Sequence, residues 1–201
     1  MKIISIDRGI FNSNSYIVYD EVTKECMVID MGVSPNYSGR IIEEKGLKVK
    51  YLVLTHGHYD HAHFVKKYIS LYPDAIAICH TNEVKVLTDP VANVTELAGV
   101  GCSYDCDFKL VNDKDVLSLG DLEFEVLSFP GHTPGCICLL NVENKVMFTG
   151  DVIFADGIGR TDFKYGDYTA MINSLNTISK MDKDITIYPG HGNIARLGNA
   201  I

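Results

Sequence analysis

Residues 55–61, with the sequence Thr-His-Gly-His-Tyr-Asp-His, constrain this chain more than any other stretch. Four of these seven residues can bind metals, and they directly follow an apolar run that is typical of a buried strand. Histidines two positions apart on extended chain project to the same side. Asp60 and His61 lie where residues 62–69 can begin a helix. One strand-to-helix turn therefore offers imidazoles and a carboxylate to two neighbouring points, which suits divalent metals such as zinc.

Three more polar segments later in the chain each contain one candidate ligand. His132 lies in Gly-His-Thr-Pro-Gly, Asp151 in Thr-Gly-Asp and His191 in Pro-Gly-His-Gly, each directly after strand-forming residues. Glycine permits the tight turns that aim side chains at a common centre, and loops at strand ends often carry sites. The remaining histidines, His63 and His80, have no comparable setting and are interpreted as ordinary residues.

The length of 201 residues predicts a single domain over residues 1–201, large enough for a substantial core. An apolar fraction of 46% with 22% charged residues is typical of a globular protein. The N-terminal residues become charged too early for a signal peptide, and no apolar run approaches membrane-spanning length. We therefore expect a cytoplasmic protein that has no membrane partner and whose six cysteines are reduced thiols.

The formal net charge of −8 argues against nucleic-acid substrates, because binding a phosphate backbone requires a basic surface. Lysine and arginine occur in short pairs at most, such as Lys66-Lys67. The composition thus favours a small-molecule substrate. It does not indicate an oligomeric state.

Two sets of predicted strands are separated and followed by helices, which fits a layered α/β sandwich. The first thirty residues read as a strand meander, and four short strands are predicted over residues 116–148. Ser34, Thr81 and Asp167 are predicted to cap helices. Residues 91–108 have no clear periodicity and are interpreted as a loop over the site.

These motifs, in this order, resemble those of the metallo-β-lactamase superfamily. The sequence from Asp151 through Gly-Ile-Gly-Arg160-Thr-Asp-Phe163, together with Tyr-Pro-Gly-His191-Gly, is similar to the short members of the glyoxalase II (hydroxyacylglutathione hydrolase) branch. The resemblance spans essentially the whole chain. It implies a four-layer αβ/βα sandwich with two metal ions at one edge.

The resemblance also implies a role for each ligand. It places one metal ion on His56, His58 and His132, a second on Asp60, His61 and His191, and Asp151 between both. Imidazole and carboxylate ligands favour zinc, with iron or manganese as alternatives. A hydroxide bridging the two ions would attack a carbonyl carbon, and Asp60 would orient it and take its proton. This chemistry suits a thioester such as S-lactoylglutathione.

Arg160 and Tyr165 are the candidates for holding an acidic substrate tail. A guanidinium pairs with a carboxylate through two hydrogen bonds. The alternative for Arg160 is a structural salt bridge to Asp162.

Three other functions compete with thioester hydrolysis. The first is an iron-dependent persulfide dioxygenase, which would use one metal on His56, His132 and Asp151. The second is hydrolysis of a lactone, a β-lactam or another ester by the same hydroxide. The third is a metal-stabilised binding module without catalysis. The complete set of seven ligands favours a two-metal hydrolase over the dioxygenase and the binding module, because neither needs all seven.

Overall fold

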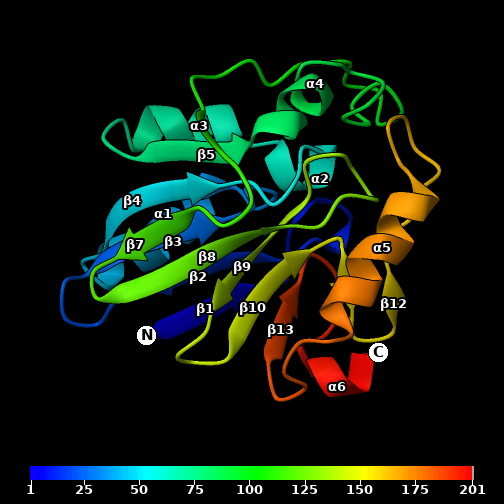
Figure 1. Ribbon diagram of the computed structural model, residues 1–201. Helices are drawn as coiled ribbons and strands as arrows, with labels where there is room; N and C mark the ends of the chain where they lie inside the picture. The colour runs from blue at the N-terminus through cyan, green and yellow to red at the C-terminus, as the bar shows by residue number, and fades with distance from the viewer. Residues whose placement is uncertain (201) are drawn as a thin grey trace.

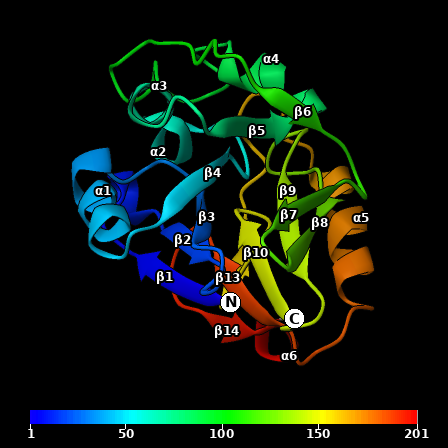
Figure 2. The same cartoon turned by 90° about the vertical axis from the view of Figure 1, so that its left-hand side faces the viewer.

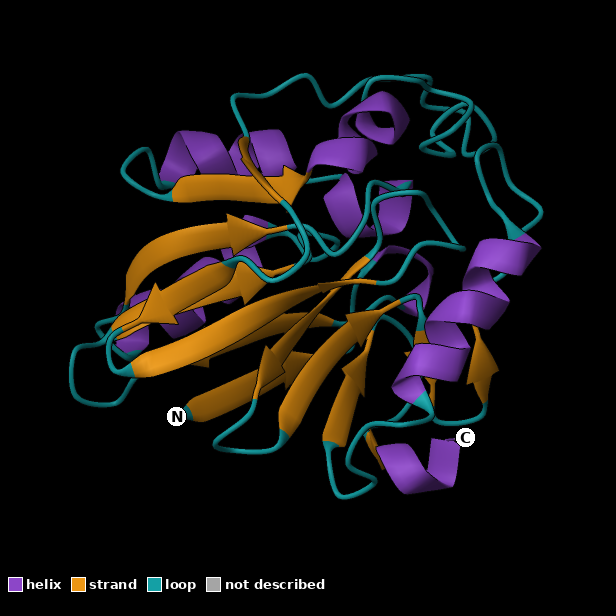
Figure 3. Cartoon of the chain, viewed as in Figure 1, coloured by secondary structure: helices purple, strands orange, loops and turns teal. Residues whose placement is uncertain are grey.

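The computed structural model describes residues 1–200, which form two six-stranded sheets packed face to face. Figure 2 shows the layers from the side, with α1 outside one sheet and α5 outside the other. The predicted four-layer αβ/βα sandwich is confirmed (Figures 1 and 3). No helix among residues 1–200 has the length and apolar character needed to cross a membrane.

The first sheet contains the six N-terminal strands in sequential order, and its strands β3 to β6 run parallel. Its strands are β1 (Lys2–Ile6), β2 (Ser15–Tyr19), β3 (Glu25–Ile29), β4 (Lys48–Val53), β5 (Ile76–His80) and β6 (Lys109–Val111). Both faces of this sheet are covered, so its central strands are almost continuously apolar.

The second sheet has the order β14-β13-β10-β9-β8-β7, and only its β10–β13 pair is parallel. Its strands are β7 (Val116–Leu119), β8 (Leu122–Ser128), β9 (Ile137–Asn141), β10 (Val146–Gly150), β13 (Thr186–Pro189) and β14 (Ala195–Arg196). A small hairpin of β11 (Ile153–Phe154) and β12 (Gly157–Ile158) follows β10.

Most helices cover the first sheet, and α5 and α6 cover the second. The helices are α1 (Pro35–Glu44), α2 (Tyr59–Ala62), α3 (Val65–Leu71), α4 (Val84–Leu87), α5 (Tyr168–Ile178) and α6 (Leu197–Ala200), with 3-10 turns η1 (Ile10–Asn12) and η2 (Thr81–Glu83). The Ser34 and Asp167 caps are confirmed, since Ser34 accepts from the N–H of Asn36 and Asp167 from that of Ala170.

Side chains that alternate along the strands divide the interior into three packed layers. Tyr16 and Val18 point between the sheets, for example, whereas Ile17 points toward the helices of the first sheet. Phe124 and Phe148 of the second sheet complete the central layer. The sheets are therefore held together by an apolar layer.

Two predicted elements differ from the structure. The helix expected over residues 62–69 is split into α2 and α3, because the N–H of Phe64 donates to the carbonyl of Met31 at 3.0 Å. Thr81 does not cap the next helix. Instead, the His80 ring accepts from the N–H of Asn82 at 3.1 Å, so the cap lies one residue earlier.

Candidate metal centre

The four polar segments of the sequence meet at one edge of the sandwich. His56 and His58 follow β4, and the short helix α2 carries Asp60 and His61. His132, Asp151 and His191 follow β8, β10 and β13 of the second sheet. Gly190 is required here, because a side chain on it would collide with the Asp151 carboxylate. The site is thus shared between the two sheets.

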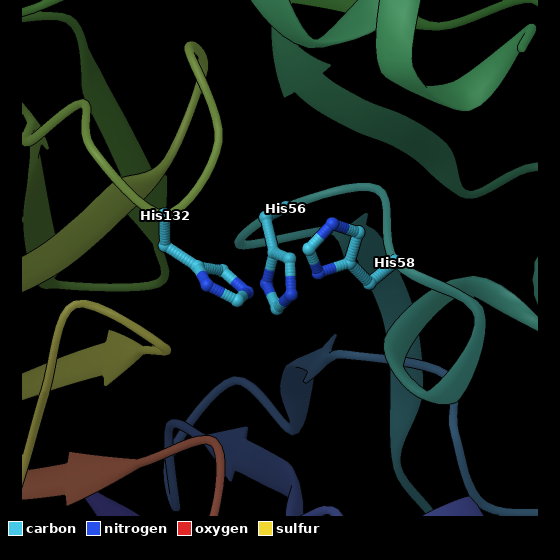
Figure 4. A group of neighbouring side chains, drawn as sticks. All are labelled: His56, His58 and His132. Carbon is cyan, nitrogen blue, oxygen red and sulfur yellow. The ribbon is translucent and has the colours of Figure 1, made fainter. Parts of the chain in front are cut away.

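The potential ligand atoms form three overlapping groups, each with all atoms within 4.8 Å of one another. The groups are His56, His58 and His132 (Figure 4); Asp60, His61 and His191; and His56, His61 and Asp151. Asp151 Oδ1 lies 3.4 Å from His61 Nε2, and Asp151 Oδ2 lies 3.6 Å from the Nε2 atoms of both His132 and His191. All seven residues predicted as ligands are therefore brought together. We call His56, His58 and His132 the first triad and Asp60, His61 and His191 the second triad; Asp151 lies between them.

Buried atoms without hydrogen-bond partners indicate that this centre suits metal ions. The Nε2 atoms of His56, His58 and His132 and the Oδ1 atom of Asp151 are inaccessible and have no partner within the described chain. Such atoms are costly to bury unless something binds them. The donor set of imidazoles and carboxylates is the one that zinc, iron and manganese accept.

Hydrogen bonds that the Nδ1 atoms donate leave the Nε2 atoms facing the centre. His132 Nδ1 donates to the carbonyl of Arg160 at 2.7 Å, and His61 Nδ1 donates to the Asp30 carboxylate at 2.8 Å. These oxygens only accept, so the Nε2 atoms are left for a metal. His56 Nδ1 lies 3.2 Å from the Thr55 hydroxyl, which itself donates to Asp30.

Burial and neighbouring charges shift the pKa values in opposite directions across the site. Burial, followed by neighbouring histidines, holds the pKa of His56 and His58 well below the usual value, so both rings are neutral at pH 7. Burial would also lower the pKa of His61, but Asp60, Asp151 and Asp30 raise it well above its usual value. Burial opposes ionisation of Asp60, yet the nearby His61 and His191 lower its pKa.

Asp30 is a functional residue that was missed in the sequence. It directly follows β3 and accepts from the Thr55 N–H, the Thr55 hydroxyl and His61 Nδ1, each at 2.8 Å. Its backbone has a φ of 58°, a conformation that is uncommon for residues other than glycine. An aspartate directly after a buried strand was the available signal.

Glu83 was missed as well, and it joins the two loops that carry His56, His58 and His132. It is fully buried, and its Oε1 accepts from the Gly57 N–H at 2.7 Å. Its Oε2 accepts from the Thr133 hydroxyl at 2.8 Å and from the Gly135 N–H at 2.9 Å. Burial raises the pKa of Glu83 to about 7, although these three donors oppose the shift. No sequence pattern links these residues.

The N-terminal segment fixes the loop that carries His191. Asn14 Nδ2 donates to the carbonyls of Pro189 and Gly192, both at 3.0 Å, and the Tyr16 hydroxyl donates to that of Pro189 at 2.6 Å. Ser13 Oγ donates to the carbonyl of Asp60 at 2.8 Å. The helix that carries Asp60 and the loop that carries His191 are therefore both hydrogen-bonded to residues 13–16.

A pocket opens above the candidate ligand side chains, and Val94 and Leu97 of the 91–108 segment form part of its wall. Arg160 lines this pocket, but its Nε and Nη2 donate to the Asp162 carboxylate at 2.6 and 2.7 Å. The salt bridge foreseen as the alternative for Arg160 is therefore present. Tyr165 is not among the lining residues. Its ring instead lies near the ammonium groups of Lys85 and Lys164, and its role as a substrate contact stays a prediction.

The two remaining histidines lie outside the ligand groups. His63 is partly exposed at the end of α2 and packs edge-on against Tyr59 and Phe64. His80 is buried, and its Nε2 lies 2.9 Å from the Ser128 hydroxyl. Local hydrogen bonds account for His80, whereas His63 is held by aromatic packing and its Nδ1 is buried without a hydrogen-bond partner among the described residues.

The family profile described as the metallo-beta-lactamase superfamily matches residues 8–191, and the chain belongs to this superfamily. Hydroxyacylglutathione hydrolase GloC from Haemophilus influenzae is 35% identical over 202 residues, covering 98% of this chain and 94% of the relative. The predicted resemblance to the glyoxalase II branch is thereby confirmed.

Solved structures agree with this assignment of the fold. The BLEG-1 B3 metallo-beta-lactamase matches with a TM-score of 0.89 and 29% identity over 98% of this chain and 95% of that one. TTHA1623, solved in a di-iron-bound form, matches with a TM-score of 0.84 and 24% identity, covering 98% and 96%. At that lower identity the likeness concerns the fold alone.

Proposed function

We propose that this protein is a two-metal hydrolase of thioesters, with S-lactoylglutathione or a related acyl thioester as substrate. The observation that carries the proposal is the convergence of seven imidazole and carboxylate side chains, four of which have buried atoms without partners. Two adjacent triads with Asp151 between them have more ligands than one ion needs. The hydroxyacylglutathione hydrolase from Haemophilus influenzae supports the choice of a thioester.

Two divalent ions at this centre, zinc first and iron or manganese as alternatives, would supply a nucleophilic hydroxide near neutral pH and positive charge for a developing oxyanion. The protein's own side chains provide the rest of the chemistry. Asp60 Oδ2 lies 3.0 Å from His191 Nε2 and 3.4 Å from His61 Nε2, at the floor of the pocket. We assign it the role of orienting the nucleophile and taking its proton.

The leaving group of a thioester suits this site. A thiolate needs little help from a general acid, and the described side chains that line the pocket include no lysine or cysteine to provide it. The proposal includes a single-domain enzyme acting on a small molecule in the cytoplasm, without nucleic-acid or membrane partners.

Metal analysis combined with two assays tests the proposal against the persulfide dioxygenase. The purified protein should contain about two metal equivalents and release free thiol from S-lactoylglutathione. One equivalent of iron, together with oxygen uptake on glutathione persulfide and no thioester cleavage, would replace the hydrolase by the dioxygenase. Hydrolysis of lactones or other esters in preference to every thioester would move the assignment to that class.

A further inference from the structure

The walls of the pocket differ in character from its floor. The ligand side chains form the floor, whereas six of the side chains above them are apolar. The six are Phe11, Val94, Leu97, Phe154, Ile158 and Phe163. They come from η1, from the segment after α4 and from the region of the β11–β12 hairpin, so parts of the chain distant in sequence contribute to one apolar surface.

Three of these wall side chains are unusually exposed for apolar residues. The exposed fractions are 77% for Leu97, 65% for Phe11 and 40% for Ile158. Exposed apolar side chains gathered around a cleft mark a surface that binds something apolar. Phe11 and Val94 also have positive φ angles of 52° and 66°. Such backbone strain, greatest for the β-branched Val94, is typical of functional positions.

The charges in the pocket disfavour an acidic ligand at this wall. Arg160 is the one lysine or arginine among its described lining residues, and both oxygens of Asp162 already accept from it. Its guanidinium also stacks 4.0 Å from the centre of the Phe163 ring. A substrate carboxylate at this wall would have to compete with Asp162, whereas a neutral chain would cover apolar surface at no such cost.

We infer that the preferred substrates are thioesters of apolar acyl chains several carbons long. The acyl chain lies along Phe11, Leu97 and Ile158 while the scissile carbonyl faces the ligand side chains. This inference rests on the proposed thioester hydrolysis and narrows its substrate class. It differs from a preference for a short hydroxyacyl group on glutathione, which would leave most of the wall uncovered.

The test is a series of N-acetylcysteamine thioesters from acetyl to octanoyl, in which the leaving group stays the same. kcat/KM should rise about two- to fourfold for each added methylene until the wall is covered. S-Lactoylglutathione is measured beside the series. If that compound is hydrolysed but kcat/KM does not depend on chain length, the inference fails and the proposed function stands. If no thioester is hydrolysed, both fail.

Two substitutions in the wall test whether the dependence of kcat/KM on acyl chain length arises there. Leu97→Ser and Phe11→Ser should each lower the ratio of octanoyl to acetyl kcat/KM by about tenfold. Both side chains are largely exposed, so the fold should persist, as checked by the melting temperature. Val91→Ser is the matched control, because Val91 is 53% exposed on the same segment but does not line the pocket. An unchanged ratio in both wall variants would overturn the inference.

Discussion

Asp60 is ionised at neutral pH because His61 and His191 lower its pKa against the effect of burial. Replacing it by asparagine preserves shape but removes the proton acceptor and one negative charge. Asp60→Asn should therefore fold normally and lose about 100- to 10,000-fold in kcat. Steady-state assays and circular dichroism check this, with Asp156→Asn, an exposed aspartate beyond β11, as the control. Near-normal turnover in Asp60→Asn would disprove the assigned role.

Glu83 joins the loop that carries His56 and His58 to the loop that carries His132, although its hydrogen bonds go to Gly57, Thr133 and Gly135 and not to the ligand side chains. Glu83→Gln replaces one accepting oxygen by an NH₂ group, which then faces a backbone N–H or hydroxyl donor. Metal affinity should fall about 10- to 100-fold, as is typical when a group that orients ligands is removed. Titration of the metal-free protein with cobalt, followed by absorbance, measures this directly.

Thr133 provides a matched pair for the same prediction. Thr133→Ser keeps the hydroxyl that donates to Glu83, whereas Thr133→Val removes it at similar volume. Cobalt affinity should be retained in the serine variant and reduced in the valine variant. Equal affinities in both, and in Glu83→Gln, would show that Glu83 serves stability alone.

The candidate ligands were predictable from sequence because they lie in glycine-containing turns after strands, with Asp60 and His61 on the short helix α2 that directly follows the first of these turns. His56, His132 and His191 each have that local signature. Asp30 also directly follows a strand, but the partners of Asp30 and Glu83 lie 25 to 52 residues away, and no local pattern links either carboxylate to them. The role of such a carboxylate becomes visible only when the fold brings its hydrogen-bond partners next to it.

Asp20 connects two turns at the end of the sandwich opposite the metal centre. Its carboxylate accepts from the N–H groups of Val22 and Thr23 after β2 and from that of Asp121 between β7 and β8. The hydrogen bond from Asp121, followed by the other two, lowers the pKa of Asp20. A lowered pKa means that the stabilisation is present above the ordinary pKa of about 4 and is lost as the pH falls through the folded-state value.

Asp20→Asn should accordingly lower the melting temperature at pH 7 and have progressively less effect as the pH falls below about 4. Melting curves of both proteins across this range measure the difference. The exposed Asp74, replaced by asparagine, serves as a control. A difference that is the same at every pH would mean that the ionised carboxylate contributes nothing.

The helices α1 and α5 begin after the expected caps Ser34 and Asp167, whereas the cap expected at Thr81 was wrong. The segment over residues 91–108 is different, because irregular backbone turns and side-chain hydrogen bonds hold it instead of a regular helix or strand ladder. Asn93 Nδ2 donates to the carbonyls of Leu87 and Cys102, and the Thr95 hydroxyl donates to the Asn93 side chain. Hydrogen bonds of this kind leave no repeating pattern in a sequence.

Metal binding should stabilise the whole molecule, because the ligands come from both sheets. An ion present at about 1,000 times its Kd contributes roughly 4 kcal/mol, which corresponds to about 10 °C in melting temperature for a chain of this size. Scanning calorimetry before and after removal of the metal by a chelator measures the shift, and added zinc should restore it. An unchanged melting temperature after complete metal loss would contradict a centre that joins the sheets.

The hydrogen bonds from Asn14 and Tyr16 to the His191 loop join residues 173 to 178 positions apart. Contacts this distant in sequence form late in folding, since chain entropy must be lost before they are gained. The second triad thus depends on contacts between the two ends of the chain. The first triad joins residues 56, 58 and 132, which are much closer in sequence. During refolding, the polypeptide should become competent for one ion before it can accept two.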